Sequence, residues 1–398
     1  MIVRAARALV LAAAAVALAG CSSMPESPTS WLPKIPAPRW DRIFDRSGKP
    51  GPLPELKATR EAHLDWQVGV GKAQPGLAPA LVEDALYAAS NDGTLVRVEA
   101  GTGRVVWRIS AGHTLSAGPG ADDKRVVVGT DKGDVLAFDT AAGKPLWTAH
   151  VSTEVISPPR VADDIVLVFT GDGRVFGLSA DEGKTLWVNA HSNPPLTVRN
   201  YAGGVVSRGG LFIGTAGGRL MGLDIKTGTV GFDLAVATPK GATELERIAD
   251  VTSLPLVSER SVCAVAYQGR VACFEIVRGT LLWTRDISSL AGLTGDDRNI
   301  YVTDDKGSVH ALDRETGASV WKQDALAKRR IGGPQLVGSD LVGVVDVEGY
   351  LHLLSRSDGA YVGRLGTDGK PATDQPQQRG TSIVWQSEGG TVYSVSAK

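Results

Sequence analysis

The stretch of sequence that decides the fold covers residues 299–321 and reads NIYVTDDKGSVHALDRETGASVW. Four of its first five residues are β-branched or aromatic, which favours a strand. The aspartate-rich turn that follows ends in Gly307, because glycine reaches the positive φ of a hairpin turn without steric cost. A second strand, a turn at Gly317 and a third strand ending at Trp321 complete the unit.

The same unit recurs along the chain about every 40 residues. In seven units a first glycine is followed ten residues later by a second glycine, and four residues after that by an anchor position. Two and five residues past the first glycine, all units are apolar. Strand units at this period predict a β-propeller. The first glycines are Gly93, Gly133, Gly173, Gly218, Gly269, Gly307 and Gly349, and the anchors are Trp107, Trp147, Trp187, Phe232, Trp283, Trp321 and Gly363.

The two ends of the repeat array complement each other. An eighth unit opens at Gly390 but the chain ends before its outer strand, whereas Trp66 lies 41 residues before Trp107, in an orphan strand. The N-terminal strand is therefore expected to complete the C-terminal blade, which removes the free sheet edges of an open ring. We predict an all-β protein whose residues 61–398 form an eight-bladed propeller of four-stranded antiparallel blades.

The N-terminus has the pattern of a lipoprotein signal. Two arginines precede the apolar run 8–19, which is too short to span a bilayer, and residues 18–21 read Leu-Ala-Gly-Cys. We predict that residues 1–20 are a signal peptide, that Cys21 is lipidated, and that the proline-rich residues 21–60 are a tether. An ordinary secretory signal with an incidental cysteine is the alternative. Ser22, rather than Asp, follows the cysteine, which resembles an outer-membrane sorting signal.

Charge and histidine usage argue against nucleic-acid binding and catalysis. Removal of residues 1–20 takes the formal net charge from −1 to about −3, so the basic excess of nucleic-acid-binding proteins is missing. The six histidines are scattered, and His310 and His352 share a repeat position that is apolar in the other units, which indicates a structural role. No Ser-His-Asp or zinc-ligand spacing occurs. We expect no catalytic residues, no metal and no cofactor.

Cys263 and Cys273 flank the turn of the fifth unit. A three-residue loop at 267–269 would place them directly opposite each other, and a two-residue loop would not. Thiols of a secreted protein can pair, but direct cross-strand disulfides are strained, so two small buried hydrophobic residues are the alternative.

Two consecutive units are longer than the others, with 45 and 51 residues between first glycines. The extra residues fall after Trp187 and Phe232, in the first insertion, residues 191–201, and the second insertion, residues 238–252. Both connections lie on the same face as the aspartate–glycine hairpin turns. Because the scaffold does not need them, this face is where function is expected.

The first insertion carries the composition of a binding surface. Leu196, Val198 and Arg199 combine apolar side chains with a guanidinium, a common composition of interface hot spots. A loop that packs only on its own propeller is the alternative.

Two families share this repeat. The pattern at 301–321 resembles the repeat of pyrroloquinoline-quinone (PQQ) dehydrogenases, but those enzymes carry a vicinal cysteine pair, Ca²⁺-binding carboxylates with an Asn, and a catalytic Asp on a larger chain. No Cys-Cys pair occurs in this chain. A PQQ-dependent periplasmic dehydrogenase-like enzyme is therefore the alternative, and a non-enzyme is expected.

The whole chain more closely resembles the BamB family of lipoproteins of the β-barrel assembly (BAM) complex. The most specific stretches are residues 195–199 and 241–251. The resemblance implies a scaffold lipid-anchored to the inner leaflet of the outer membrane, with its propeller in the periplasm. In that family the two loops dock on a periplasmic POTRA domain of BamA, the barrel-inserting subunit, and nascent outer-membrane proteins are a further candidate partner.

The contact residues follow by position from the same resemblance. Leu196, Val198 and Arg199 match the family's leucine, leucine and arginine contacts, and Asp250 matches an acidic contact. Thr252 stands where the pattern can hold a second Asp. A lipoprotein propeller that binds another envelope protein or peptidoglycan is a further alternative, and it needs no contact from the 241–251 loop.

Overall fold

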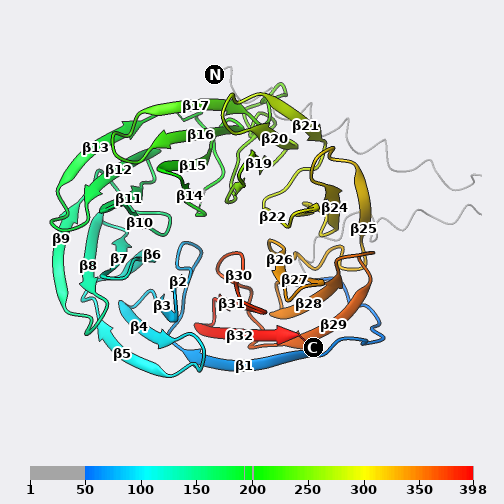
Figure 1. The fold of residues 1–398 in the computed structure, drawn as a ribbon, viewed down its shortest axis with the longest axis horizontal. Helices are drawn as coiled ribbons and strands as arrows, with labels where there is room; N and C mark the ends of the chain where they lie inside the picture. The colour runs from blue at the N-terminus through cyan, green and yellow to red at the C-terminus, as the bar shows by residue number, and fades with distance from the viewer. Residues whose placement is uncertain (1–49, 192, 200, 398) are drawn as a thin grey trace, which may run out of the picture. The chain divides into compact units, whose positions relative to one another are not determined.

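Eight four-stranded antiparallel sheets, arranged as blades around a ring, account for the strands of the described residues (Figure 1). The computed structural model describes residues 50–191, 193–199 and 201–397, all within the unit Pro50–Lys398. The predicted signal peptide 1–20, the lipidated Cys21 and the tether residues up to 49 lie outside the described residues. Within the described part of the chain, no helix is long and apolar enough to cross a bilayer.

Each blade takes its strands in chain order from the axis outward. Blades 1 to 4 are β2 (Ala80–Val82), β3 (Ala85–Ala89), β4 (Thr94–Glu99) and β5 (Val105–Ser110); β6 (Leu115–Ala121), β7 (Arg125–Thr130), β8 (Asp134–Asp139) and β9 (Pro145–His150); β10 (Arg160–Ala162), β11 (Ile165–Phe169), β12 (Arg174–Ser179) and β13 (Thr185–Ala190); and β14 (Gly204–Ser207), β15 (Gly210–Thr215), β16 (Arg219–Asp224) and β17 (Val230–Ala235).

Blades 5 to 8 continue the same order, and the last one is composite. They are β18 (Leu256–Val257), β19 (Ser261–Val265), β20 (Val271–Glu275) and β21 (Leu281–Arg285); β22 (Leu293–Gly295), β23 (Asn299–Thr303), β24 (Val309–Asp313) and β25 (Ser319–Gln323); β26 (Gln335–Val337), β27 (Leu341–Val345), β28 (Tyr350–Ser355) and β29 (Tyr361–Gly366); and β30 (Gln377–Arg379), β31 (Ser382–Gln386), β32 (Thr391–Ala397) and β1 (Ala62–Gly69).

The ring closes as predicted. Strand β1 pairs antiparallel with β32, so the first strand of the chain is the outer strand of blade 8. Trp66 of β1 lies opposite Ser394, in the place that the anchors of other blades occupy. The eight-bladed propeller closed by the N-terminal strand is confirmed.

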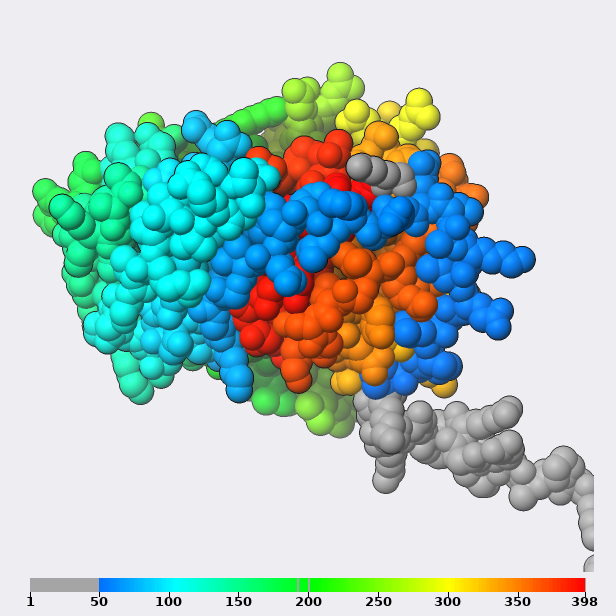
Figure 2. All heavy atoms as spheres, turned by 90° about the horizontal axis from the view of Figure 1, so that it is seen from below, coloured from blue at the N-terminus to red at the C-terminus, as the bar shows by residue number. Residues whose placement is uncertain are grey.

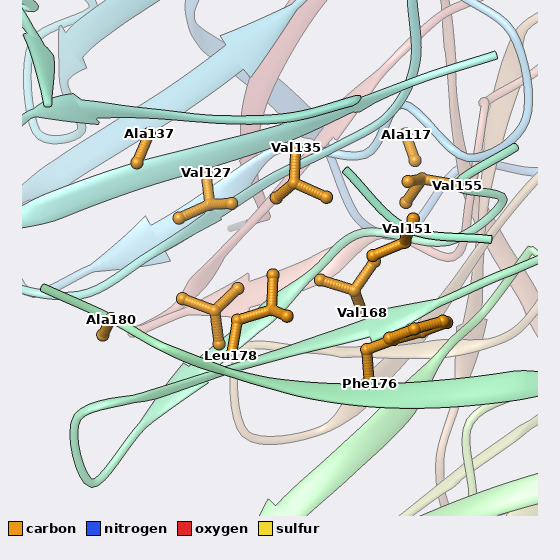
Figure 3. Close-up of a cluster of buried hydrophobic side chains, with 11 residues drawn as sticks. Ala117, Val127, Val135, Ala137, Val151, Val155, Val168, Phe176, Leu178 and Ala180 are labelled. Carbon is orange, nitrogen blue, oxygen red and sulfur yellow. The ribbon is translucent and has the colours of Figure 1, made fainter. Parts of the chain in front are cut away.

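The core is divided among the junctions between neighbouring blades. Eight hydrophobic clusters line these junctions, and each draws its buried side chains from two adjacent blades. Figure 3 shows one of them, where Val127 and Val135 of blade 2 face Val168, Phe176 and Leu178 of blade 3. The apolar positions of the repeat therefore bury against the next blade rather than against a single central core.

The anchor tryptophans join each blade to the next one. The Nε1 of Trp147 donates a hydrogen bond of 2.7 Å to the carbonyl of Ala180, and its ring lies against Gly183 in the following blade. A Cβ on Gly183 would come within 2.5 Å of that ring. The second position of the repeat therefore requires glycine for two reasons, because its φ is positive and because the tryptophan ring packs directly against it. Equivalent hydrogen bonds run from Trp66, Trp107, Trp187, Trp283 and Trp321 to the carbonyls of Ala100, Thr140, Ile225, Arg314 and Arg356.

Two junctions lack this tryptophan, and one of them is covered by the residues that precede β1. At blade 7 the anchor is Gly363, and the backbone N–H groups of Thr59 and Arg60 donate to the neighbouring carbonyl of Val362 at 2.9 and 3.1 Å. We call residues 50–61 the strap, and Figure 2 shows it in blue across the orange strands of blade 7. Residues 50–60, predicted as part of the tether, are thus hydrogen-bonded to the propeller through Gly51, Thr59 and Arg60.

Arg329 holds the far end of the strap. Its buried guanidinium donates to the carbonyl of Gly51, to Asp346 at 2.7 Å and to Glu348. Asp346 also hydrogen-bonds the Nε2 of His352 at 2.8 Å, and His352 is fully buried. The structural role predicted for His352 is therefore a place in a buried polar network, while His310 makes the equivalent 2.8 Å contact with Asp304 in blade 6.

Cys263 and Cys273 form a disulfide across β19 and β20. The two residues are directly opposite in the strand register, because the hairpin closes with the three-residue loop 267–269 between Ala266 and Arg270. Of the two alternatives left open by the sequence, the structure therefore has the disulfide. The loop has the three residues that this alternative requires.

Candidate partner-binding face

The two insertions are neighbours on one face of the ring. The first insertion connects β13 to β14 and the second connects β17 to β18, and neither contains a strand or an α-helix in its described residues. A buried carboxylate joins them. The Oδ2 atom of Asp250 accepts a hydrogen bond of 2.5 Å from the backbone N–H of Val198, and Oδ1 accepts one of 2.8 Å from Gly217.

Asp250 of the second insertion therefore holds the first insertion from a buried position, and we call it the clasp. Its exposed fraction is 2%, and its two oxygens bind the first insertion and the hairpin turn of blade 4. Its own carbonyl accepts the N–H of Tyr267 at 2.8 Å, which ties the second insertion to blade 5. The sequence resemblance implied a direct partner contact for Asp250, whereas the geometry supports a positioning role. The sequence could name this residue but could not tell that its side chain points inward.

Arg199 is held in place but remains accessible. Its guanidinium pairs with Glu154, which precedes β10, and its central carbon lies 5.3 Å from the centre of the Tyr201 ring. Its side chain is nevertheless 48% exposed. A guanidinium ordered in this way loses little conformational entropy when a partner binds it.

Leu196 and Val198 differ in accessibility. Leu196 is 44% exposed, whereas Val198, whose own N–H binds Asp250, is half-buried. The structure thus brings all four predicted residues together on one face, with Leu196 and Arg199 at the surface and Val198 and Asp250 progressively deeper.

The second insertion presents an apolar side chain that was not singled out from the sequence. Leu245 is 67% exposed on a short turn, where Glu246 accepts the N–H groups of Ala242 and Thr243 at 2.8 and 3.2 Å. The hydroxyl of Thr243 in return accepts the N–H of Glu246 at 3.3 Å, which makes a capping box. Those backbone N–H groups lower the pKa of Glu246. The Thr-x-x-Glu pattern that contains Leu245 is the sequence signal that could have indicated this capped turn.

A hollow of ≈ 360 Å³ lies beside Val198 and Arg199, between blades 3 and 4. Ile156, Phe169, Val198 and Ile213 contribute its apolar lining, and His191 also lines it. Burial lowers the pKa of His191, and its Nδ1 makes no hydrogen bond within the described part of the chain. The candidate partner-binding face is therefore indented next to Arg199 rather than flat.

The residues do not fit a quinone-and-calcium site. The described residues contain no group of three or more histidine, cysteine or acidic side chains arranged to hold a metal ion. The cysteines of the fifth unit are ten residues apart and bonded to each other inside blade 5, so they cannot supply a vicinal pair. The described residues thus carry the dehydrogenase-like repeat without a vicinal cysteine pair and without such a group of three side chains.

Comparison with known proteins agrees with this distinction. The chain is 35% identical to the outer membrane protein assembly factor BamB of Bordetella pertussis over 99% of its own length and 98% of that protein. The crystal structure of BamB from Moraxella catarrhalis matches with a TM-score of 0.78 and 26% identity, covering 84% of this chain and 99% of that one.

A more distant neighbour shows the fold alone. The quinohemoprotein alcohol dehydrogenase of Comamonas testosteroni matches with a TM-score of 0.68 but 12% identity, covering 84% of this chain and 76% of that one. The family model described as outer membrane protein assembly factor BamB matches residues 91–323 and, in an overlapping match, 305–398. With this coverage and the two insertions in place, the chain belongs to the BamB family of outer membrane protein assembly factors.

Proposed function

We propose that this protein is a non-catalytic lipoprotein subunit of the BAM complex, and that it supports the insertion of β-barrel proteins by binding a POTRA domain of BamA. The observation that carries the proposal is the clasp at Asp250, which fixes two separate insertions as one surface. Leu196 and Leu245 add apolar side chains to this surface, where they are 44% and 67% exposed.

The residues of this face have distinct roles in the proposal. Leu196 and Arg199 contact the partner directly, because both are accessible and Arg199 is already ordered by Glu154. Val198 and Asp250 position them from below. A binding surface with fixed loops is expected to gain affinity, since little ordering accompanies association.

The same proposal includes the location of the protein. Acyl chains on Cys21 would hold it at the inner leaflet of the outer membrane, with residues 21–49 as the tether and the propeller in the periplasm. Mass spectrometry of the mature N-terminus tests this part, and an unmodified N-terminus that begins elsewhere than Cys21 would contradict it.

Co-purification from detergent-solubilised envelopes tests the binding face. We expect BamA to be recovered with the tagged wild type and about tenfold less with Leu196→Ala/Arg199→Ala, because truncation of interface hot spots costs at least this factor. Arg104→Ala is the matched control, because Arg104 is also an exposed arginine paired with a carboxylate, Glu99, but lies in the turn between β4 and β5 on the opposite face. Equal recovery with all three proteins would refute the proposed face, and no BamA with the wild type would refute the partner.

A further inference from the structure

We propose that the partner-binding surface continues past the two insertions to the connection between blades 5 and 6, where Leu290 is a third apolar contact. This inference rests on the function proposed above. It also includes a second hollow, next to Leu290, as the site that receives one apolar side chain of the partner protein.

Leu290 is exposed although its backbone is fixed. Its side chain is 47% exposed on residues 286–292, between β21 and β22. Its N–H donates to Asp305 at 3.0 Å, and its carbonyl accepts the hydroxyl of Thr252 at 3.5 Å. The second insertion is thus connected to Leu290 through Thr252.

The neighbouring residues hold the same connection from below. The N–H of Ser289 donates to the carbonyl of Ala266 at 3.4 Å, and the hydroxyl of Ser289 accepts the N–H of Gly292 at 3.0 Å. The hydroxyl of Ser288 accepts the N–H of Gln268 at 2.8 Å. An apolar side chain on a loop fixed in this way is pre-organised for binding.

The hollow links Leu290 to the residues already assigned to the partner. It measures ≈ 270 Å³ and is lined by Val198 and Arg199 of the first insertion, by Thr252 of the second insertion and by Leu290. A protein that contacts Leu196 and Arg199 therefore extends over this hollow as well. The continuity with the proposed face is the reason to expect the same partner here.

The size and lining of the hollow point to a single apolar side chain. Sites for drug-sized ligands begin at about 300 Å³, so this hollow suits a smaller group. Pro75, Ala202, Leu254 and Ala291 line one part of it together with Leu290, and polar side chains, among them Thr373, Asp374 and Gln375, line the rest. A protruding aliphatic or aromatic side chain of a folded partner domain matches the apolar part of this lining.

The test compares three variants of the full-length lipoprotein by their affinity for purified, detergent-solubilised BamA. Leu290→Asp is expected to weaken binding about tenfold, and Leu290→Ala by a smaller factor, because a charge cannot be desolvated in the interface. Leu281→Asp is the matched control, since Leu281 is 52% exposed but lies on the outer strand β21, away from this face. Circular dichroism and urea unfolding establish that each variant is folded.

The outcomes separate this inference from the function on which it rests. Weaker binding in Leu196→Ala/Arg199→Ala but wild-type affinity in Leu290→Asp would overturn the extended surface and leave the proposed function standing. An equal loss in Leu281→Asp would also overturn it, because the effect would then not be local. Absence of BamA binding by the wild type would overturn both.

Discussion

The chain departs from its repeat in two regions, and their surface chemistry is opposite. On the closure side, where Gly363 replaces the anchor tryptophan, the strap covers the gap and Arg329 is buried among its partners. On the insertion side, in the connections that leave blades 3 and 4, Leu196 and Leu245 stand in solvent.

The difference distinguishes a departure that serves the fold from one that we propose serves a partner. A structural departure pairs its buried polar groups with one another, as Arg329, Asp346 and His352 do. The insertion face satisfies its backbone through Asp250 and Glu246 but leaves its apolar side chains uncovered. We therefore treat an irregularity in the repeat as a candidate binding surface where exposed apolar groups accompany it.

The largest expected effect is on the closure side. Arg329→Met removes the guanidinium that holds the strap and pairs with Asp346, so the free energy of unfolding should fall by about 3–5 kcal/mol. Urea unfolding measures the loss. The control is Arg60→Met, whose ion pair with Asp340 is exposed and is expected to contribute about 0–1 kcal/mol. Equal losses in the two variants would show that burial of Arg329 is unimportant to closure.

The disulfide of blade 5 is the next strongest contribution. Replacing both cysteines in Cys263→Ala/Cys273→Ala should lower the free energy of unfolding by about 2–3 kcal/mol, because the short loop is no longer closed in the unfolded chain. A reductant should destabilise the wild type to a similar extent and leave the double variant unchanged. If the double variant and the oxidised wild type unfold at the same urea concentration, the cross-link contributes nothing.

The fold could be predicted because the same residues that define the repeat also make the junctions. The spacing of Gly143 and Trp147 encodes a turn and an anchor, and the structure uses both in contacts between blades. Trp66 revealed the closure for the same reason, since its distance from Trp107 equals the repeat length. Local patterns that coincide with long-range contacts are the part of a fold that sequence reveals.

The strap and the clasp were hidden because their contacts depend on tertiary geometry. A proline-rich segment gives no sign that Gly51 meets Arg329, which lies 278 residues further along the chain. Likewise an acidic residue in a loop can point toward a partner or inward, and Asp250 points inward. That the two insertions lie on one face could be predicted, whereas the layering of exposed and buried residues within them could not.

A pH effect on the closure side follows from His352. Burial lowers the pKa of His352 below its ordinary value of 6.5, although the neighbouring Asp346 opposes the shift. The unfolded chain therefore binds the proton first, and stability should fall as pH drops from about 6.5 through the folded pKa. His352→Gln should flatten the pH dependence of the urea midpoint between pH 7 and 5. A slope as steep as that of the wild type would exclude His352 as its source.

The smallest expected effect tests the junction beside the second insertion. Phe232 occupies an anchor position, opposite Gly222, just as Trp187 lies opposite Gly177 in the preceding blade. Phe232→Trp would offer an indole N–H to the carbonyl of Ile276, the counterpart of Ile225, and should stabilise the protein by about 0.5–1.5 kcal/mol. Trp187→Phe, the reverse change one blade earlier, should destabilise it by a similar amount.

The gain at Phe232 has a structural limit that makes the comparison informative. Leu234 now contacts Gly279, the glycine on which an indole at 232 would rest, so the larger ring must displace it. Destabilisation by Phe232→Trp would mean that this junction is adapted to Leu234. Phe232 would then be a further departure that serves the fold, located next to the insertion that we propose binds the partner.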